Sequence, residues 1–226
     1  MFSIKICGVT SVNDALMVAA AGADAVGLNF YPKSPRYVTP ELARRISEAL
    51  SWRVVKVGLF VNASSREVCR TFDQLRLDLI QLHGDEPPEF LGELGGRPVM
   101  RAFRVGADGL RPVAEYLDQC GKTGCTPRLV LMDSAQDGQY GGTGALPDWS
   151  ALEGYPIEAA HPPMVLAGGL TPENVGHAIH TVRPTAVDAA SGVETSPGRK
   201  GDLLVQRFVK AARQAFESMA RPDERH

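Results

Sequence analysis

The chain has 226 residues, of which 44% are hydrophobic and 22% charged, a composition typical of a globular protein with a full core. Its 24 basic and 26 acidic side chains leave a formal net charge of -2, which argues against nucleic acid or an acidic membrane surface as a partner. No apolar run approaches the roughly 20 residues of a membrane helix, and the N-terminus lacks the features of a signal peptide, so we expect a cytoplasmic protein.

Eight short apolar runs, many of them rich in β-branched residues, follow one another along the chain. Their hydrophobicity is continuous rather than alternating, which is typical of strands that are covered on both faces in a parallel sheet. The runs are residues 3–7, 24–30, 54–60, 77–83, 98–105, 128–133, 164–168 and 185–190. The sequence therefore predicts eight strands of one sheet.

Helical patterns with recognisable starts lie between several of these strands. The predicted helices are residues 12–23, 40–50, 66–75, 173–182 and 203–219, and the expected N-terminal caps are Ser11, Thr39, Ser65 and Thr171. Residues 85–94 hold a short helix at best, and we expect residues 120–125 to form a loop before a strand. Residues 133–149 are long and glycine-rich, and such loops tend to be functional or mobile.

A strand followed by a helix, repeated along one short chain, predicts an α/β protein folded as a single (β/α)8 TIM barrel. We assign residues 1–219 to this domain and residues 220–226 to a polar C-terminal tail. A doubly wound open sheet is the alternative, and we favour the barrel because eight strands without a long insertion fit closure better. In a barrel the chemistry lies at the C-terminal ends of the strands, so residues at those ends are the candidates.

Glycine-rich segments follow the seventh and eighth predicted strands. Gly168 and Gly169 stand between a strand and a helix start, and Ser191 and Gly192 follow the next strand. Glycines let backbone N–H groups approach an anion closely, and barrels frequently bind phosphate with these two loops. The alternative is that both segments are only tight turns. We therefore predict a phosphate site at these four residues.

Cys7 and Asp133 end the first and sixth predicted strands. Counting back by twos, Lys5 and Leu131 share the inward face with them if the strand ends point into the barrel mouth. A thiolate can accept a proton and a carboxylic acid can donate one, so the pair can supply a general base and a general acid. The simpler interpretations are a buried structural cysteine and an aspartate that caps a turn.

Other side chains at strand ends are candidates for binding. Arg36 lies in the segment YPKSPRYV, where two prolines stiffen the loop and suit the guanidinium to a carboxylate. His83 could orient a substrate or bond to its own loop. We interpret Asp188 as a hydroxyl-binding or structural group. A Schiff-base lysine is an alternative within two of the strands, at Lys5 or Lys56.

Neither a metal site nor a disulfide framework is predicted. The four cysteines form no CxxC pair and show no Cys/His spacing typical of zinc ligands. His177 and His180 lie one helical turn apart, but no third ligand accompanies them.

Several motifs together closely resemble those of one enzyme family. They are KICGVT, GADAVGLNFYPKSPRYV, VGLFVN, IQLHGDE, LMDS with GGTG, LAGGLTPENV and VDAASGVETSPGRKGD. The set extends from Lys5 to about Asp202 and is similar to that of the phosphoribosylanthranilate isomerases. Two positions depart from the family pattern: Ala190 stands where serine is frequent, and Asn29 occupies a strand position that is usually apolar.

The resemblance implies conversion of N-(5-phosphoribosyl)anthranilate into 1-(2-carboxyphenylamino)-1-deoxyribulose 5-phosphate in tryptophan biosynthesis, without metal or organic cofactor. It implies that Cys7 is the general base, that Asp133 is the general acid and that Arg36 binds the substrate carboxylate. Gly142 would belong to a loop element that contacts substrate. The implied partner is a phosphorylated small molecule, and the chain is expected to be a monomer or a homodimer.

These roles set a requirement on protonation. Near pH 7 a thiol with a pKa of about 8.5 is mostly protonated, and a carboxyl with a pKa of about 3.9 is mostly ionised. We expect burial to raise the pKa of Asp133, and Lys5 or a helix N-terminus to favour the Cys7 thiolate.

Two other functions stay open. A histidine-pathway isomerase or synthase on the same barrel would have twin aspartates at the ends of strands one and five, and these are missing here. A non-catalytic barrel that binds phosphorylated metabolites is the other alternative.

Overall fold

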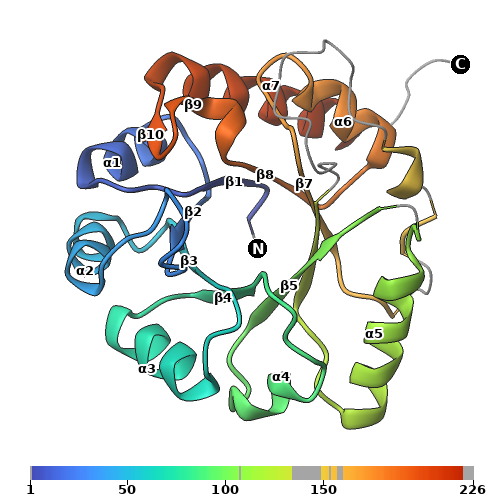
Figure 1. Cartoon of the computed structure of the whole chain (residues 1–226). Helices are drawn as coiled ribbons and strands as arrows, with labels where there is room; N and C mark the ends of the chain where they lie inside the picture. Colours follow the sequence, from blue (N-terminus) through green and yellow to red (C-terminus); the bar gives the residue numbers. More distant parts are fainter. Residues whose placement is uncertain (1, 107, 134–148, 153, 157–159, 221–226) are drawn as a thin grey trace, which may run out of the picture.

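A computed structural model describes residues 2–106, 108–133, 149–152, 154–156 and 160–220. Eight parallel strands, β1 to β8, close into a barrel in chain order, and the helices surround it (Figure 1). The predicted TIM barrel is therefore confirmed. Among the helices of the described residues, none combines the length and apolar character that a bilayer crossing requires.

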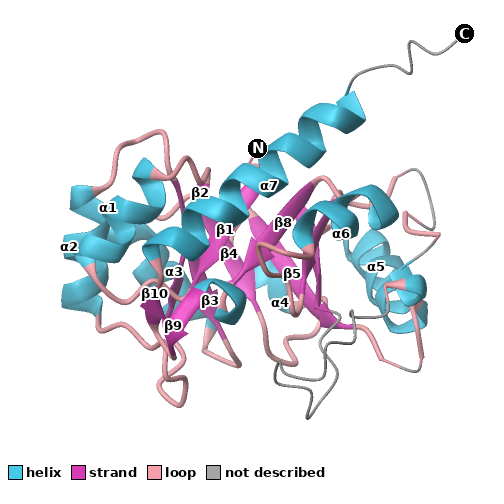
Figure 2. Cartoon of the chain, turned by 90° about the horizontal axis from the view of Figure 1, so that it is seen from above, coloured by secondary structure: helices cyan, strands magenta, loops and turns pink. Residues whose placement is uncertain are grey.

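Each barrel strand falls inside one of the eight apolar runs. The strands are β1 (Ile4–Cys7), β2 (Ala25–Asn29), β3 (Val55–Phe60), β4 (Leu79–Leu82), β5 (Val99–Arg104), β6 (Leu129–Asp133), β7 (Met164–Ala167) and β8 (Ala186–Ala189). An antiparallel pair that was not predicted follows β8, formed by β9 (Glu194–Ser196) and β10 (Arg199–Lys200). This hairpin lies at the lower rim of the barrel in Figure 2.

Seven α-helices and two short 3₁₀ helices are described. They are α1 (Val12–Ala20), α2 (Pro40–Ala49), α3 (Ser65–Leu75), α4 (Phe90–Glu93), α5 (Arg111–Thr123), α6 (Val175–Val182) and α7 (Asp202–Ala220), with η1 (Ser150–Leu152) and η2 (Ser191–Val193). The caps predicted for α1 and α2 are confirmed, since Ser11 Oγ accepts from the Asp14 amide and Thr39 Oγ1 from the Leu42 amide.

Three local predictions are wrong. Cys120 belongs to the last turn of α5, and the helix ends only at Gly124, whose φ of 70° is left-handed. The cap of α3 is Ser64 rather than Ser65, because the Ser64 hydroxyl accepts from the Glu67 amide at 3.3 Å. The helix expected from residue 173 begins at Val175 instead, since Thr171 Oγ1 accepts from the Glu173 amide within a turn.

Alternate residues of each strand pack in two separate cores. Inward side chains such as Val57, Met100 and Leu131 fill the barrel, and outward ones such as Ile6 and Ile80 pack against the helices. This double coverage explains the continuous hydrophobicity of the strands. Figure 2 shows the strands enclosed by the helical layer.

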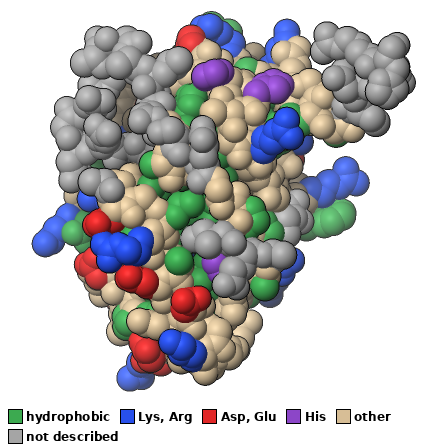
Figure 3. All heavy atoms as spheres, turned by 90° about the vertical axis from the view of Figure 1, so that its right-hand side faces the viewer, with side chains coloured by type: hydrophobic (Ala, Val, Ile, Leu, Met, Phe, Trp, Pro, Cys, Tyr) green, Lys and Arg blue, Asp and Glu red, His purple; other side chains and the backbone are tan. Residues whose placement is uncertain are grey.

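The outer surface carries charges of both signs. On the face shown in Figure 3, acidic and basic side chains are interspersed. Exposed ion pairs contribute to this mixture, for example Arg111 with Asp108 at 2.8 Å. This face therefore carries no field of a single sign.

Candidate active site

A cavity of about 470 Å³ opens at the C-terminal ends of the barrel strands. Eight of the nine residues predicted to form the site line it: Cys7, Arg36, His83, Asp133, Gly168, Gly169, Ser191 and Gly192. The ninth, Gly142, lies outside the described residues. The expectation that the ends of β1 and β6 share one void with the two glycine loops is thus met in the structure, while the role of each residue stays a prediction.

Cys7 is the last residue of β1, and its side chain is 6% exposed. The neighbouring strand makes room for the thiol at Gly27, where an added Cβ would lie 2.7 Å from Cys7 Sγ. Gly27 also holds the chain beyond β1, because its carbonyl accepts from the amides of Gly8 and Val9. The thiol therefore sits in a space that a larger residue on β2 would close.

Lys5 lies below Cys7 on the inward face of β1, as predicted, and is fully buried. Its Nζ donates to Asp188 Oδ1 of β8 at 2.9 Å. Burial opposes the ammonium, but Asp188 and Cys7 outweigh it and raise the pKa of Lys5. Asp188 is thus the counter-ion of Lys5, which fits the structural interpretation of that residue. Lys56, the other alternative for a Schiff base, points to the outer face of β3 between two inward residues.

The expectation for the charge of Cys7 needs correction. Burial raises the pKa of the Cys7 thiol, and the opposing effects of Lys5 and Lys200 do not offset it. Lys5 acts in the expected direction, but the desolvation of the thiolate is larger. The free site therefore holds Cys7 mainly as a thiol at neutral pH.

Asp133 ends β6 and His83 follows β4, and both side chains are half-buried at the cavity. Gln81 is fully buried inside the barrel, and its amide nitrogen lies 2.9 Å from His83 Nδ1. Burial lowers the pKa of His83, although Asp133 acts in the opposite direction. A neutral ring that accepts at Nδ1 carries its proton on Nε2, so this assignment makes His83 a hydrogen-bond donor at its other nitrogen.

The two glycine loops lie next to each other in the lining of the cavity. Gly168 and Gly169 have φ values of 93° and 63°, a conformation that glycine adopts without strain. Gly192 lies directly against the first loop, since a Cβ at this position would collide with the Leu170 carbonyl oxygen. Asn174 ties the first loop down by donating to the Gly169 carbonyl at 2.9 Å. The sequence thus forms a compact backbone surface, which is suited to an anion.

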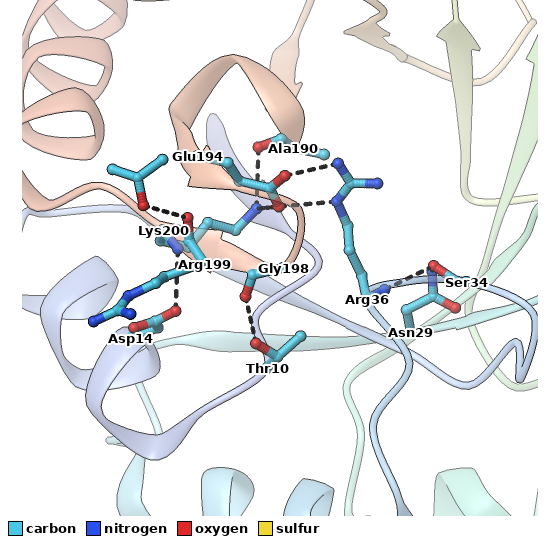
Figure 4. A network of polar contacts seen from close by, with 11 residues as sticks. Thr10, Asp14, Asn29, Ser34, Arg36, Ala190, Glu194, Gly198, Arg199 and Lys200 are labelled. Carbon is cyan, nitrogen blue, oxygen red and sulfur yellow. Dashed lines mark hydrogen bonds and ion pairs between the residues drawn. The ribbon is translucent and has the colours of Figure 1, made fainter.

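The loop that carries Arg36 is shaped by Asn29, for which the sequence offered no explanation. Asn29 Oδ1 accepts from the Tyr31 amide at 2.8 Å, and its Nδ2 donates to Ser34 Oγ at 3.0 Å. The same hydroxyl accepts from the Arg36 amide at 3.1 Å (Figure 4). A polar residue at the end of β2 therefore fixes the backbone from which Arg36 extends.

Arg36 is held by a carboxylate to which the sequence analysis assigned no role. Its Nε and Nη2 donate to the two oxygens of Glu194 at 2.8 and 2.7 Å, a bidentate pair (Figure 4). Lys200 Nζ donates to Glu194 Oε1 at 2.8 Å and to the Ala190 carbonyl at 3.0 Å. The signal that could have found these residues is the turn PG between ETS and RK, which is typical of a hairpin.

Burial and charged neighbours both shift the pKa values of the hairpin residues Glu194 and Lys200. Burial opposes the ionised form of Glu194, yet the hydrogen bonds from Arg36 and Lys200 lower its pKa overall. Burial lowers the pKa of Lys200, with Glu194 acting against that change. Glu194 is therefore the shared anion between two cations.

The closed barrel has a cavity at its C-terminal mouth, with glycine loops after β7 and β8 and with a thiol and a carboxyl in its lining. This is the layout of a barrel enzyme that binds a phosphorylated small molecule. A family model, N-(5'phosphoribosyl)anthranilate (PRA) isomerase, matches residues 4–211. The chain belongs to this family.

Individual relatives agree with that result. The chain is 49% identical over 212 residues to the N-(5'-phosphoribosyl)anthranilate isomerase of Pseudomonas aeruginosa (strain LESB58), with 93% of this chain and 94% of the relative covered. It is 44% identical over 214 residues to that of Geobacter sulfurreducens, with 94% and 99% covered. The crystal structure of the Thermotoga maritima isomerase superposes with a TM-score of 0.81 at 40% identity, covering 95% of this chain and all of that one.

Proposed function

We propose that this chain isomerises N-(5'-phosphoribosyl)anthranilate to its 1-deoxyribulose 5-phosphate product, the Amadori rearrangement of tryptophan biosynthesis. The observation that carries the proposal is that Cys7, Asp133, Arg36 and both glycine loops line one cavity. A related structure, with a TM-score of 0.79 at 39% identity and covering 95% of this chain and all of that one, is described as a complex with reduced 1-(o-carboxyphenylamino)-1-deoxyribulose 5-phosphate.

The reaction needs one acid and one base. Asp133 donates a proton to the furanose ring oxygen, and the ring C–O bond breaks as the anilino nitrogen forms an iminium. Cys7 then removes the proton from the adjacent sugar carbon, and the electron pair moves to the nitrogen to give an enolamine. Tautomerisation of the enolamine gives the ketone. The substrate's own nitrogen is the electron sink.

The raised pKa of Cys7 fits a base that is activated by its substrate. Burial keeps the thiol protonated in the empty site, so the thiolate needs a positive charge nearby. Lys5 supplies part of it, and the iminium formed in the first step supplies more. Proton abstraction is then tied to ring opening, because the cation that favours the thiolate exists only after the ring has opened.

The two ends of the substrate account for Arg36 and for the two glycine loops. The phosphate binds to backbone donors around Gly168, Gly169, Ser191 and Gly192, and the aromatic carboxylate binds Arg36. Holding both ends places the reacting carbons between Cys7 and Asp133. The chain works as a monomer or as a homodimer, the latter being the state named for the T. maritima isomerase.

The test is an assay with freshly generated phosphoribosylanthranilate. We expect Cys7→Ser and Asp133→Asn to lower kcat by roughly 10²- to 10⁴-fold, the effect of removing a positioned base or acid. Arg36→Ala should mainly raise KM. An Arg97→Met variant, changed on the outer surface, is the control and should keep wild-type rates. Near-normal turnover in Cys7→Ser and Asp133→Asn would contradict the assigned roles.

A further inference from the structure

Gln81 is a polar side chain inside the barrel that the proposed reaction does not use. It is fully buried on the inward face of β4, since its neighbours Ile80 and Leu82 pack on the outer side. The residues in register with it, Leu59 of β3 and Met100 of β5, are apolar and buried. A buried amide is costly unless its hydrogen bonds are made, so a glutamine at this position needs a reason.

The amide of Gln81 is only half satisfied within the part of the chain that the structure describes. Its nitrogen lies 2.9 Å from His83 Nδ1, whereas its Oε1 is buried and has no hydrogen-bond partner among the described residues. An unpaired buried acceptor lowers the stability of a fold, so an apolar side chain of similar size would serve a purely structural role better. The contact with His83 is therefore the feature that a glutamine supplies here.

The orientation of this amide follows from the hydrogens that it carries. With its nitrogen towards His83, it leaves one oxygen and one N–H group unpaired. Turned over, it would leave two N–H groups unpaired, and buried N–H groups lack a partner more rarely than carbonyl oxygens do. Gln81 therefore donates to Nδ1. Burial lowers the pKa of His83, which favours the neutral ring, and a neutral ring that accepts at Nδ1 carries its proton on Nε2.

His83 is held by its backbone as well as by Gln81. Its amide donates to the Phe60 carbonyl at 2.9 Å, and the amide of the next residue, Gly84, donates to Glu86 Oε2 at 3.0 Å. The Nε2 atom of His83 is not buried, and it has no hydrogen-bond partner among the described residues. Because His83 lines the cavity, the ring presents one N–H group to a molecule bound there.

We propose that Gln81 is a positioning residue, which holds His83 in the Nε2–H tautomer so that the ring donates a hydrogen bond to an oxygen atom of the bound substrate. Figure 1 shows β4 across the barrel from β8, so His83 faces the part of the substrate that lies away from the glycine loops. This inference rests on the proposed function only in taking the cavity as the substrate site. The tautomer itself belongs to the empty site and can be measured without substrate.

Heteronuclear NMR of protein labelled at the histidine ring nitrogens measures the tautomer directly. Among the signals of the five histidines, that of His83 is the one that His83→Ala removes. We expect a neutral ring with its proton on Nε2 in the wild type. In Gln81→Met the Nδ1 atom loses its donor, so the two ring signals should move towards the average of two exchanging tautomers. Gln74→Met, on the exposed face of α3, is the matched control and should leave them unchanged.

Steady-state kinetics show whether this tautomer matters to the reaction. We expect Gln81→Met to lower kcat/KM by about tenfold, near the upper end for a hydrogen bond between neutral groups. The free energy of unfolding should stay the same or rise, because the unpaired oxygen is lost with the amide. In a His83→Ala background the same substitution should change kcat/KM by less than about threefold, since Gln81 acts through His83. Gln74→Met should change neither quantity.

The outcomes separate this inference from the proposed function. A wild-type His83 that carries its proton on Nδ1, or on both nitrogens, would overturn the role of Gln81 and leave the proposed function intact. An unchanged kcat/KM in Gln81→Met, or an equal loss with and without His83, would overturn it too. A wild-type protein that does not turn over phosphoribosylanthranilate would overturn the proposed function, and with it the assignment of the His83 donor to a substrate oxygen.

Discussion

Gly27 decides how much room the Cys7 thiol has. An added Cβ would lie 2.7 Å from Cys7 Sγ, 3.0 Å from Cys7 Cα and 3.1 Å from Lys5 Nζ, all shorter than ordinary contacts. The backbone and the paired ammonium cannot move far, because β1 is hydrogen-bonded to β2 and β8 on its two sides. The thiol is the group that must give way.

Gly27→Ala should therefore impair the site more than the fold. We expect a loss of about 1–3 kcal/mol in the free energy of unfolding, as for other overpacked cores. The fall in kcat should be about tenfold or more, because a shift of about 1 Å in a catalytic group can cost up to about 100-fold. Steady-state assays measure the fall in kcat, and urea unfolding measures the loss in the free energy of unfolding.

Gly121→Ala is the matched control for this substitution. Gly121 lies in α5 with open space around its Cα, so an added methyl group should stabilise the helix by up to about 1 kcal/mol and leave kcat unchanged. If Gly27→Ala behaved like Gly121→Ala, the space at Gly27 would have no part in holding Cys7.

Which residues could be found from the sequence follows from how local their signals are. Cys7 and Asp133 were found because a barrel rule turns strand ends into site positions, and that rule needs only the strand boundaries. The pairing of Glu194 with Arg36 could not be predicted in the same way, since the two residues are 158 positions apart and only the closed barrel brings them together. Asn29 looked out of place in the sequence because its partners belong to a turn, not to the strand.

At the scale of elements, the helix that follows β4 is the shortest of the described α-helices. The helix α4 has four residues, and on the next strand, β5, the side chain of Arg101 is buried on the outer face. Its guanidinium donates to the carbonyls of Leu82 and Gly84 and lies 5.2 Å from the ring centre of Phe103. Arg101 therefore joins β5 to the loop that follows β4.

Arg101→Met should be strongly destabilising. It removes hydrogen bonds to three carbonyls and leaves Glu86, which is 4% exposed, without its nearby cation. We expect a loss of about 3 kcal/mol or more in the free energy of unfolding, measured in urea. Arg97→Met breaks the more exposed pair with Asp73 and should cost about 1 kcal/mol or less. Equal effects of the two substitutions would show that Arg101 contributes no more than a surface arginine.

The elements themselves were predictable to different degrees. All eight strands were found because each strand lies within an apolar run that is at least as long as the strand itself. The helix α5 was not among the predicted helices, and residues 120–125 at its C-terminal end were assigned to a loop because Gly121 and Gly124 are typical of loops, although only Gly124 has a left-handed φ. The hairpin of β9 and β10 is too short for a periodic pattern, and its contacts include those of the buried Lys200 with Glu194 and the Ala190 carbonyl.

At the scale of the whole molecule, the barrel closes where its first and last strands meet. Lys5 of β1 lies in register with Asp188 of β8, and their side chains form the buried ion pair at 2.9 Å. The pair therefore joins two strands that are far apart in the chain. It also fills the layer of the barrel directly below Cys7, where the apolar core gives way to the cavity.

Asp188→Asn should leave a buried ammonium without its counter-ion. Breaking a buried pair from one side costs about 3–5 kcal/mol, so we expect a loss of that size in the free energy of unfolding at neutral pH. The double variant Asp188→Asn/Lys5→Met removes the isolated charge and should recover most of the loss. A double variant no more stable than Asp188→Asn would mean that the charge of Lys5 is not the cause.

The pH dependence gives the same pair a signature of its own. The pKa of Lys5 is raised above its ordinary 10.5, so its contribution to stability is complete below 10.5 and is lost as the pH rises through the folded value. In Asp188→Asn burial acts without its main opponent and lowers the pKa of Lys5, so this variant gains stability as the pH rises towards 10.5. The difference in unfolding free energy between the two proteins should therefore shrink between neutral pH and pH 10.5, and urea titrations of both proteins across that range measure it. A difference that stays constant would place the stabilising effect of Asp188 in packing rather than in charge.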